Sequence, residues 1–194
     1  MPKRQNGQEL IRSCTFDIET SNLNGDFGIL LCGVIKPSGD SPKIYRLDKL
    51  SKCWSTKRSY DKPVVEAFSN ELSKYDIVAG HNHVRFDLNF LRTRALYWGL
   101  PSIPEFKAAI DSCQLLRNKF KLSWNSLDKA TDFLNFNKKT PVSGNVWMSA
   151  FLDGNKKAMQ SIVDHCIADV YMTEELIIRI KDYSKKLNNW GSAY

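Results

Sequence analysis

The sequence predicts an α/β domain with a mixed five-stranded sheet, in which three antiparallel strands are followed by two parallel ones and helices flank the sheet. Two observations lead to this prediction. Three apolar segments come first, separated only by loops and a turn, as in an antiparallel meander. Helical and short apolar segments then alternate, as in a parallel sheet. We expect one domain over residues 1–194, with residues 1–11 a flexible N-terminus.

The expected strands are short apolar segments bounded by turn-forming residues. The first three are residues 12–18 (RSCTFDI), 28–35 (GILLCGVI) and 43–47 (KIYRL). The fourth is residues 76–80 (DIVAG), and the fifth lies within residues 106–116 (FKAAIDSCQLL).

The expected helices follow the helical spacing of apolar residues. Residues 63–75 have apolar side chains at positions 64, 65, 68 and 72, and Pro63 suits a first turn. The next helix, residues 86–100, should direct Phe86, Phe90, Leu91 and Leu96 to the core.

Three further helices are expected towards the C-terminus. One covers residues 126–136, with Ser126 as its N-cap. A short one lies within residues 146–155, and a long one runs from about Lys156 to Lys186.

Composition narrows the class of protein. The 28 basic and 21 acidic residues give a net charge of +7, which favours polyanions such as nucleic acid. We expect a cytoplasmic protein without a membrane contact, because no apolar run approaches the ~18 residues of a membrane span and the N-terminus lacks a signal-peptide core. The five scattered cysteines have no metal-binding spacing and are expected to be free thiols.

The segment FDIET, residues 16–20, contains the first chemical signal. On a β-strand, Asp17 and Glu19 project from the same side, and two adjacent like charges are costly unless a cation lies between them. Asp87 at a helix start and Asp169 on the last helix are further acids in apolar surroundings. Four carboxylates from three segments suit two hard divalent cations, Mg²⁺ or Mn²⁺.

Three segments in this order, FDIET, HNHVRFDLNFL and HCIADV, resemble the three motifs of the DEDD superfamily of 3′→5′ exonucleases. The segment DSCQLLRNKFKLSWNSLDKATDFL is similar to a phage and bacterial subgroup related to the family-B polymerase exonuclease domain. The resemblance runs from about Cys14 to Tyr183. It implies a ribonuclease H-like fold and a two-metal-ion exonuclease that releases nucleoside 5′-monophosphates from a free 3′ end. Single-stranded DNA is favoured over RNA as the substrate. The resemblance to the phage and bacterial subgroup also leaves open that a phage encodes the protein and that it acts in the bacterial cytoplasm.

The resemblance also implies metal-binding roles for the acids. Asp17 would bridge both ions, and Glu19 and Asp169 would complete the ligands of one. Asp87 would hold the other ion, partly through water. Asp111, in IDSC, matches an acid often found near the site and is expected to support it.

The last motif has the spacing of the tyrosine-containing DEDD subgroup, but histidine at that position. His165 and Asp169 are four residues apart, so they share a helix face. With an unperturbed pKa near 6.5, a histidine can accept a proton from the attacking water at neutral pH. We expect His165 to be the general base; the alternative is that it only orients water or packs, with reduced activity.

Substrate contacts follow from the same resemblance. The backbone near Thr20 would face the 3′-hydroxyl, Leu23 would act as an apolar wedge, and Asn82 would help to shape the site. Phe86 would pack by the terminal sugar or base, or else belong to the core. Basic residues near the motifs could follow the phosphates: Arg85, Arg117, Lys119, Lys121, Lys138 and Lys139.

Two other features remain open in the sequence. Trp147 could pack over the site or in the core. His81 and His83 are expected to be structural or to face substrate rather than to bind metal, because hard cations favour oxygen. Two alternative functions also remain: an exoribonuclease or oligoribonuclease with the same site, and a catalytically weakened nucleic-acid-binding module.

Overall fold

The computed structural model describes residues 11–136 and 142–183. The expected flexible N-terminus therefore lies outside the described residues, apart from residue 11. Lys138 and Lys139 also lie outside them, as does the expected end of the last helix at residues 184–186.

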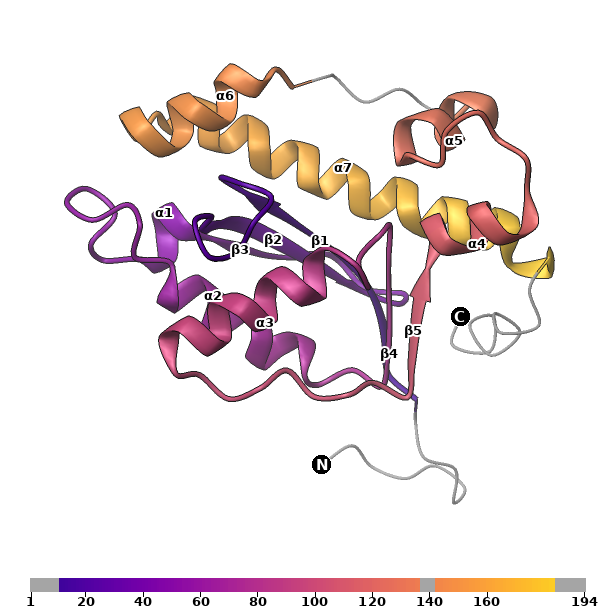
Figure 1. Ribbon diagram of the computed structural model, residues 1–194, viewed down its shortest axis with the longest axis horizontal. Coiled ribbons are helices and arrows are strands. Elements are labelled where there is room, and N and C mark those ends of the chain that lie inside the picture. The colour runs from indigo at the N-terminus through magenta and orange to yellow at the C-terminus, as the bar shows by residue number, and fades with distance from the viewer. Residues whose placement is uncertain (1–10, 137–141, 184–194) are drawn as a thin grey trace.

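A five-stranded mixed sheet forms the centre of the molecule, with the order β3-β2-β1-β4-β5 (Figure 1). The strands are Ser13–Thr20 (β1), Leu30–Pro37 (β2), Lys43–Arg46 (β3), Ile77–Gly80 (β4) and Ala108–Asp111 (β5). The first three pair antiparallel, whereas β4 pairs parallel to β1 and β5 parallel to β4. The predicted fold class is confirmed.

The strands are buried according to their place in the sheet. In β1, Phe16 and Ile18 are buried on one side, while Asp17 and Glu19 on the other side keep some exposure. Strands β2 and β4, on either side of the central strand β1, are mostly apolar and almost entirely buried, as expected for strands covered on both faces.

Helices cover both faces of the sheet. The helices α2 (Lys62–Leu72) and α3 (Asp87–Trp98) lie on one face, and the long helix α7 (Lys156–Ile180) crosses the other (Figure 1). On the α2 side, Phe68 packs against Phe16 with ring centroids 6.1 Å apart. On the α7 side, buried apolar residues such as Ile162 and Val170 face the sheet.

Most predicted helices are present. In α2 the four apolar positions 64, 65, 68 and 72 are all buried. Ser126 caps α5 (Leu127–Phe133), since its hydroxyl accepts a hydrogen bond from the backbone N–H of Lys129 at 3.4 Å.

The expected core position of Leu96 is wrong. Leu96 is 82% exposed, and α3 instead buries Leu88, Leu91 and Ala95. The reason is the helical period: Ala95 follows Leu91 by four residues and stays on its face, whereas Leu96 is rotated by a further ~100°.

Several short elements were not expected. Helix α1 (Leu47–Leu50) follows β3 directly, and α4 (Ser112–Lys119) begins immediately after β5 within the segment predicted to contain a strand. The short helix expected within residues 146–155 is present as α6 (Gly144–Met148), which begins earlier and is followed by an unexpected π-helical turn, Ser149–Asp153.

The cysteines are as expected from their scattered positions. All five cysteines are free thiols; Cys53 is exposed and the other four are buried. Within the described ranges, no helix is both long and apolar enough to cross a membrane.

Candidate active site

The candidate site lies beside the second half of β1, where the pairing with β4 has stopped. Strand β4 pairs only with Ser13–Thr15, so the backbone N–H of Ile18 is available for another acceptor. Asp87, the first residue of α3, fills this place: its Oδ1 accepts a hydrogen bond from the Ile18 N–H at 3.2 Å. A third acid is thereby placed against the strand that carries Asp17 and Glu19.

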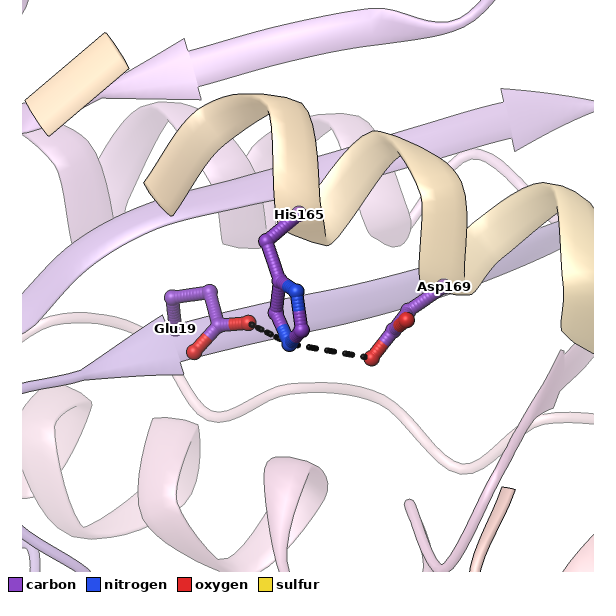
Figure 2. Close-up of side chains that lie close together, drawn as sticks. All are labelled: Glu19, His165 and Asp169. Carbon is purple, nitrogen blue, oxygen red and sulfur yellow. Dashed lines mark ion pairs between the residues drawn. The ribbon is translucent and has the colours of Figure 1, made fainter. Parts of the chain in front are cut away.

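Helix α7 brings two more of the candidate side chains to the same end of β1. The Nε2 atom of His165 lies 4.0 Å from Glu19 Oε1 and 3.7 Å from Asp169 Oδ2 (Figure 2). One ligand atom from each of these three residues falls within 4.8 Å of the others. Because His165 and Asp169 are one helical turn apart, a single straight helix presents both to the strand.

The pKa of Asp17 depends on the three other acids of the site. Burial raises the pKa of Asp17 well above its usual value, and the nearby carboxylates of Asp87, Glu19 and Asp169 raise it further. Opposing this, the Cys166 thiol donates a hydrogen bond to Asp17 Oδ2, with Sγ 3.3 Å away. The structure therefore brings all four predicted acids into one cluster.

Asp87 is the most deeply buried acid of the cluster, with only 2% of its surface exposed. Burial raises its pKa to about 7, although the hydrogen bond from the Ile18 N–H favours the charged form. The carboxylate of Asp111 adds to the rise.

The donor set fits divalent cations. Four carboxylates that repel one another and are partly desolvated lower their free energy when a hard cation lies between them, and Mg²⁺ and Mn²⁺ prefer such oxygen ligands. Asp17, Glu19, Asp87 and Asp169 could hold these ions, with His165 next to Glu19 and Asp169.

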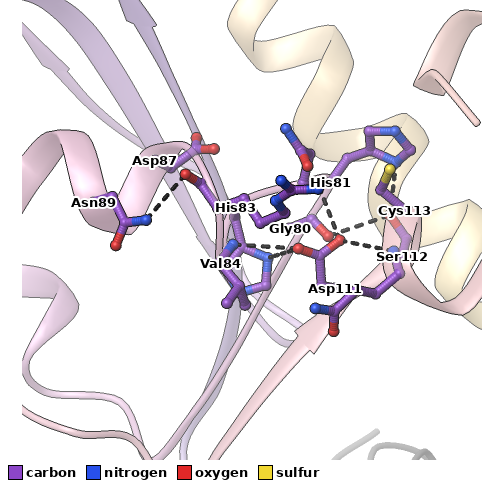
Figure 3. A network of polar contacts seen from close by, with 12 residues as sticks. Gly80, His81, His83, Val84, Asp87, Asn89, Asp111, Ser112 and Cys113 are labelled. Atoms are coloured by element: carbon purple, nitrogen blue, oxygen red, sulfur yellow. Dashed lines mark hydrogen bonds and ion pairs between the residues drawn. The ribbon is translucent and has the colours of Figure 1, made fainter. Parts of the chain in front are cut away.

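Asp111 supports the site through the loop that joins β4 to α3 (Figure 3). Its Oδ1 accepts hydrogen bonds from the backbone N–H groups of Asn82 at 2.9 Å and Gln114 at 3.2 Å, and its Oδ2 from that of Val84 at 3.2 Å. Asn82 has a φ of 59°, a left-handed conformation that asparagine tolerates better than most residues. This bracing fixes the approach to Asp87.

The two histidines of this loop contact protein groups. His81 hydrogen-bonds with Ser112 Oγ through Nδ1 and with the Asn125 carbonyl through Nε2, both at 2.9 Å. His83 is fully buried, packs edge-on against Phe16 with centroids 5.2 Å apart, and has its pKa lowered to about 4 by burial. These contacts agree with a structural role, one of the two alternatives expected for both.

Two of the four predicted substrate residues, Leu23 and Phe86, line one pocket, whereas Thr20 and Asn82 are not part of its lining. A pocket of about 400 Å³ next to α3 is lined by Leu23, Arg85, Phe86 and Phe90, among others. Leu23 is 79% exposed, and Phe86 is half-buried against Phe90. Thr20 donates a hydrogen bond to the Asn22 carbonyl at 2.8 Å and so shapes the start of the loop that carries Leu23.

Two contacts at the site were not foreseen from the sequence. Trp147 donates a hydrogen bond from its indole N–H to Glu19 Oε2 at 3.2 Å, and Cys166 contacts Asp17. The only signals were an aromatic residue of unknown orientation and a cysteine next to His165 on a helix.

Comparisons with known proteins agree with the fold. The profile of the RNase_H superfamily matches residues 14–181. Among solved structures, the family B DNA polymerase from the hyperthermophilic archaeon Pyrobaculum calidifontis has the same fold over 91% of this chain, with a TM-score of 0.70 and 16% sequence identity. The chain spans only 25% of that polymerase. A comparison with curated protein sequences found no match.

Proposed function

We propose a nuclease function for this chain, which belongs to the RNase_H superfamily: a metal-dependent 3′→5′ exonuclease that acts on single-stranded DNA and releases nucleoside 5′-monophosphates. The observation that carries the proposal is the convergence of Asp17, Glu19, Asp87 and Asp169 from β1, α3 and α7 beside His165.

The acids would hold two divalent cations, Mg²⁺ or Mn²⁺. Asp17 would bridge the two, with Glu19 and Asp169 on one side and Asp87 on the other. When bound, such ions stabilise the negative charge on the attacking and leaving oxygens of a phosphodiester.

His165 is proposed as the general base. Its Nε2 would accept one proton from the attacking water, whose oxygen then bonds to phosphorus while the bond from phosphorus to the 3′-oxygen of the preceding nucleotide breaks. The imidazolium would lie between the carboxylates of Glu19 and Asp169, 4.0 and 3.7 Å away, where its positive charge is stabilised.

The pocket beside α3 would receive the terminal nucleotide. Leu23 and Phe86 offer apolar surface to a base or sugar, and such contacts tolerate any sequence. Asn82 would keep the loop in shape, and the backbone near Thr20 would face the 3′-hydroxyl. DNA is favoured as the polymer because the structural relative is a DNA polymerase.

The proposal is tested with 5′-labelled single strands of matched DNA and RNA sequence, with Mg²⁺, Mn²⁺ or a chelator. We expect metal-dependent shortening from the 3′ end, faster on DNA, with mononucleotide products. Asp17→Asn should reduce it to background because the bridging carboxylate is lost. The matched control is Asp164→Asn, an exposed acid on the same helix as Asp169, which should keep full activity. Intact strands with wild-type protein and either metal would reject the proposal.

A second variant tests the base. His165→Ala should lower the rate at saturating metal by about 100- to 10,000-fold and remove the acidic limb of the pH–rate profile. Binding of Mn²⁺ should persist, because the carboxylates remain. Full hydrolysis by His165→Ala would contradict the base assignment and leave the nuclease proposal standing.

A further inference from the structure

Trp147 reaches the candidate site from a separate part of the chain. It lies on α6, which precedes α7 in the chain. Its indole N–H donates a hydrogen bond to Oε2 of Glu19, a residue 128 positions earlier in the sequence. The indole is half-buried and also packs edge-on against the His165 ring, with centroids 5.8 Å apart and an interplanar angle of 89°. One side chain therefore touches both a proposed metal ligand and the proposed base.

The two carboxylate oxygens of Glu19 have different contacts. Oε2 is held by the indole, whereas Oε1 is the oxygen 4.0 Å from His165 Nε2 and near Asp169. Glutamate has several rotatable bonds, and the register of β1 with β2 shifts between Glu19 and Thr20, so the sheet alone does not fix the carboxylate. A hydrogen bond to one oxygen removes much of this freedom.

The segment that carries Trp147 is fastened independently of Glu19. The Arg58 guanidinium donates to the Leu152 carbonyl at 2.7 Å, and Ala150 is fully buried. Asn155 caps α7 through its side chain, which accepts from the N–H groups of Lys157 and Ala158. Trp147 is thus held on a braced element, as a group that orients another residue must be.

We propose that Trp147 is a positioning residue for Glu19: it anchors Oε2 so that Oε1 is presented to a divalent cation beside Asp169. This inference rests on the proposed function for the meaning of the site, but it concerns metal binding and can be measured without hydrolysis.

The test measures the binding of Mn²⁺ to the full chain in the absence of nucleic acid, by electron paramagnetic resonance or calorimetry. Trp147→Phe keeps an aromatic ring beside His165 and removes the N–H donor together with part of the ring. We expect its Mn²⁺ affinity to fall about 10-fold or more, the usual effect of removing a partner that orients a metal ligand. The matched control is Trp98→Phe, which removes an indole N–H donated at 2.7 Å to Asp61, a residue outside the cluster, and should leave Mn²⁺ affinity unchanged.

A double-mutant cycle checks that the effect passes through Glu19. In a Glu19→Gln background, Trp147→Phe should weaken Mn²⁺ binding by less than about 2-fold. Equal Mn²⁺ affinity of wild type and Trp147→Phe would overturn the inference, as would an undiminished effect of Trp147→Phe in the Glu19→Gln background. If wild type binds Mn²⁺ and Trp147→Phe does not, yet wild type degrades no strand, the inference survives and the nuclease proposal fails.

Discussion

At the scale of single residues, Asp87 makes stability depend on pH. Its pKa is about 7 in the folded protein and near 3.8 when unperturbed. Between these values the folded state holds a proton that the unfolded state has released, so stability is lost as the pH rises towards about 7. His83 acts in the opposite sense, since its folded pKa of about 4 lies below the usual 6.5 and stability is gained as the pH rises through that interval.

Comparison with Asp87→Asn isolates the contribution of Asp87. In the presence of a chelator, we expect the melting temperature of Asp87→Asn to exceed that of wild type at pH 8 by about 3 °C or more, and the two to converge at pH 5. The uncharged amide can still accept from Ile18 N–H but avoids the buried charge. Scanning fluorimetry at both pH values gives the measurement.

Mg²⁺ should reverse this order. With saturating Mg²⁺ at pH 8, wild type should gain stability because the ion binds only the folded cluster, and Asp87→Asn should gain less. A chelated Asp87→Asn protein that melts below wild type at pH 8 would contradict the assigned burial cost.

Residue types and spacing were enough to predict the acids. Asp17 and Glu19 share a side because strands alternate, and His165 and Asp169 share a face because helices repeat every 3.6 residues. The partner of Glu19 was beyond such rules. Trp147 is 128 residues away from it, and only the packing of α6 over the end of β1 brings the indole to the carboxylate.

At the scale of elements, the position of Asp87 depends on where the pairing between β1 and β4 ends. Both β1 and β4 were predicted, but not that β4 pairs with only three residues of β1. That early end exposes the Ile18 N–H to Asp87 and turns a helix start into part of the site. Register is a property of two segments together, so neither sequence alone contains it.

A buried ion pair between elements was also invisible in the sequence. Arg94 on α3 donates to both oxygens of Asp61, at 2.7 and 3.0 Å, and to the Gly25 carbonyl at 3.1 Å. Asp61 also accepts from the Leu30 N–H at 2.8 Å. These bonds join α3 to β2 and to the loop that carries Leu23. Arg94 gave no sequence signal because it resembles any other charge on an amphipathic helix.

At the scale of the whole molecule, the mixed sheet with helices packed on it followed from the alternation of segments. The strand order β3-β2-β1-β4-β5 did not, because it depends on which strands pair in space. The net charge of +7 predicted a polyanionic partner but not which part of the surface would bind it. The structure supplies one candidate surface. Helix α4 begins at Ser112, whose hydroxyl forms a hydrogen bond of 2.9 Å with His81, so α4 adjoins the loop that leads to Asp87.

The segment from Arg117 to Trp124 therefore predicts how the protein holds a strand. Arg117, Lys119 and Lys121 are exposed, and Trp124 is 71% exposed, which suits phosphate contacts with base stacking. Binding of an oligonucleotide to the uncleaving Asp17→Asn variant should weaken with salt, with a log–log slope of about −0.7 per phosphate contact. Adding Arg117→Gln and Lys121→Gln to this variant should make the slope shallower by up to about 1.4.

The paired control is Lys49→Gln with Lys52→Gln near α1, which lies at the opposite end of the sheet from α4 (Figure 1). Fluorescence anisotropy across a salt series measures each slope; equal slopes for both pairs would show that net charge alone, and not this segment, attracts the strand.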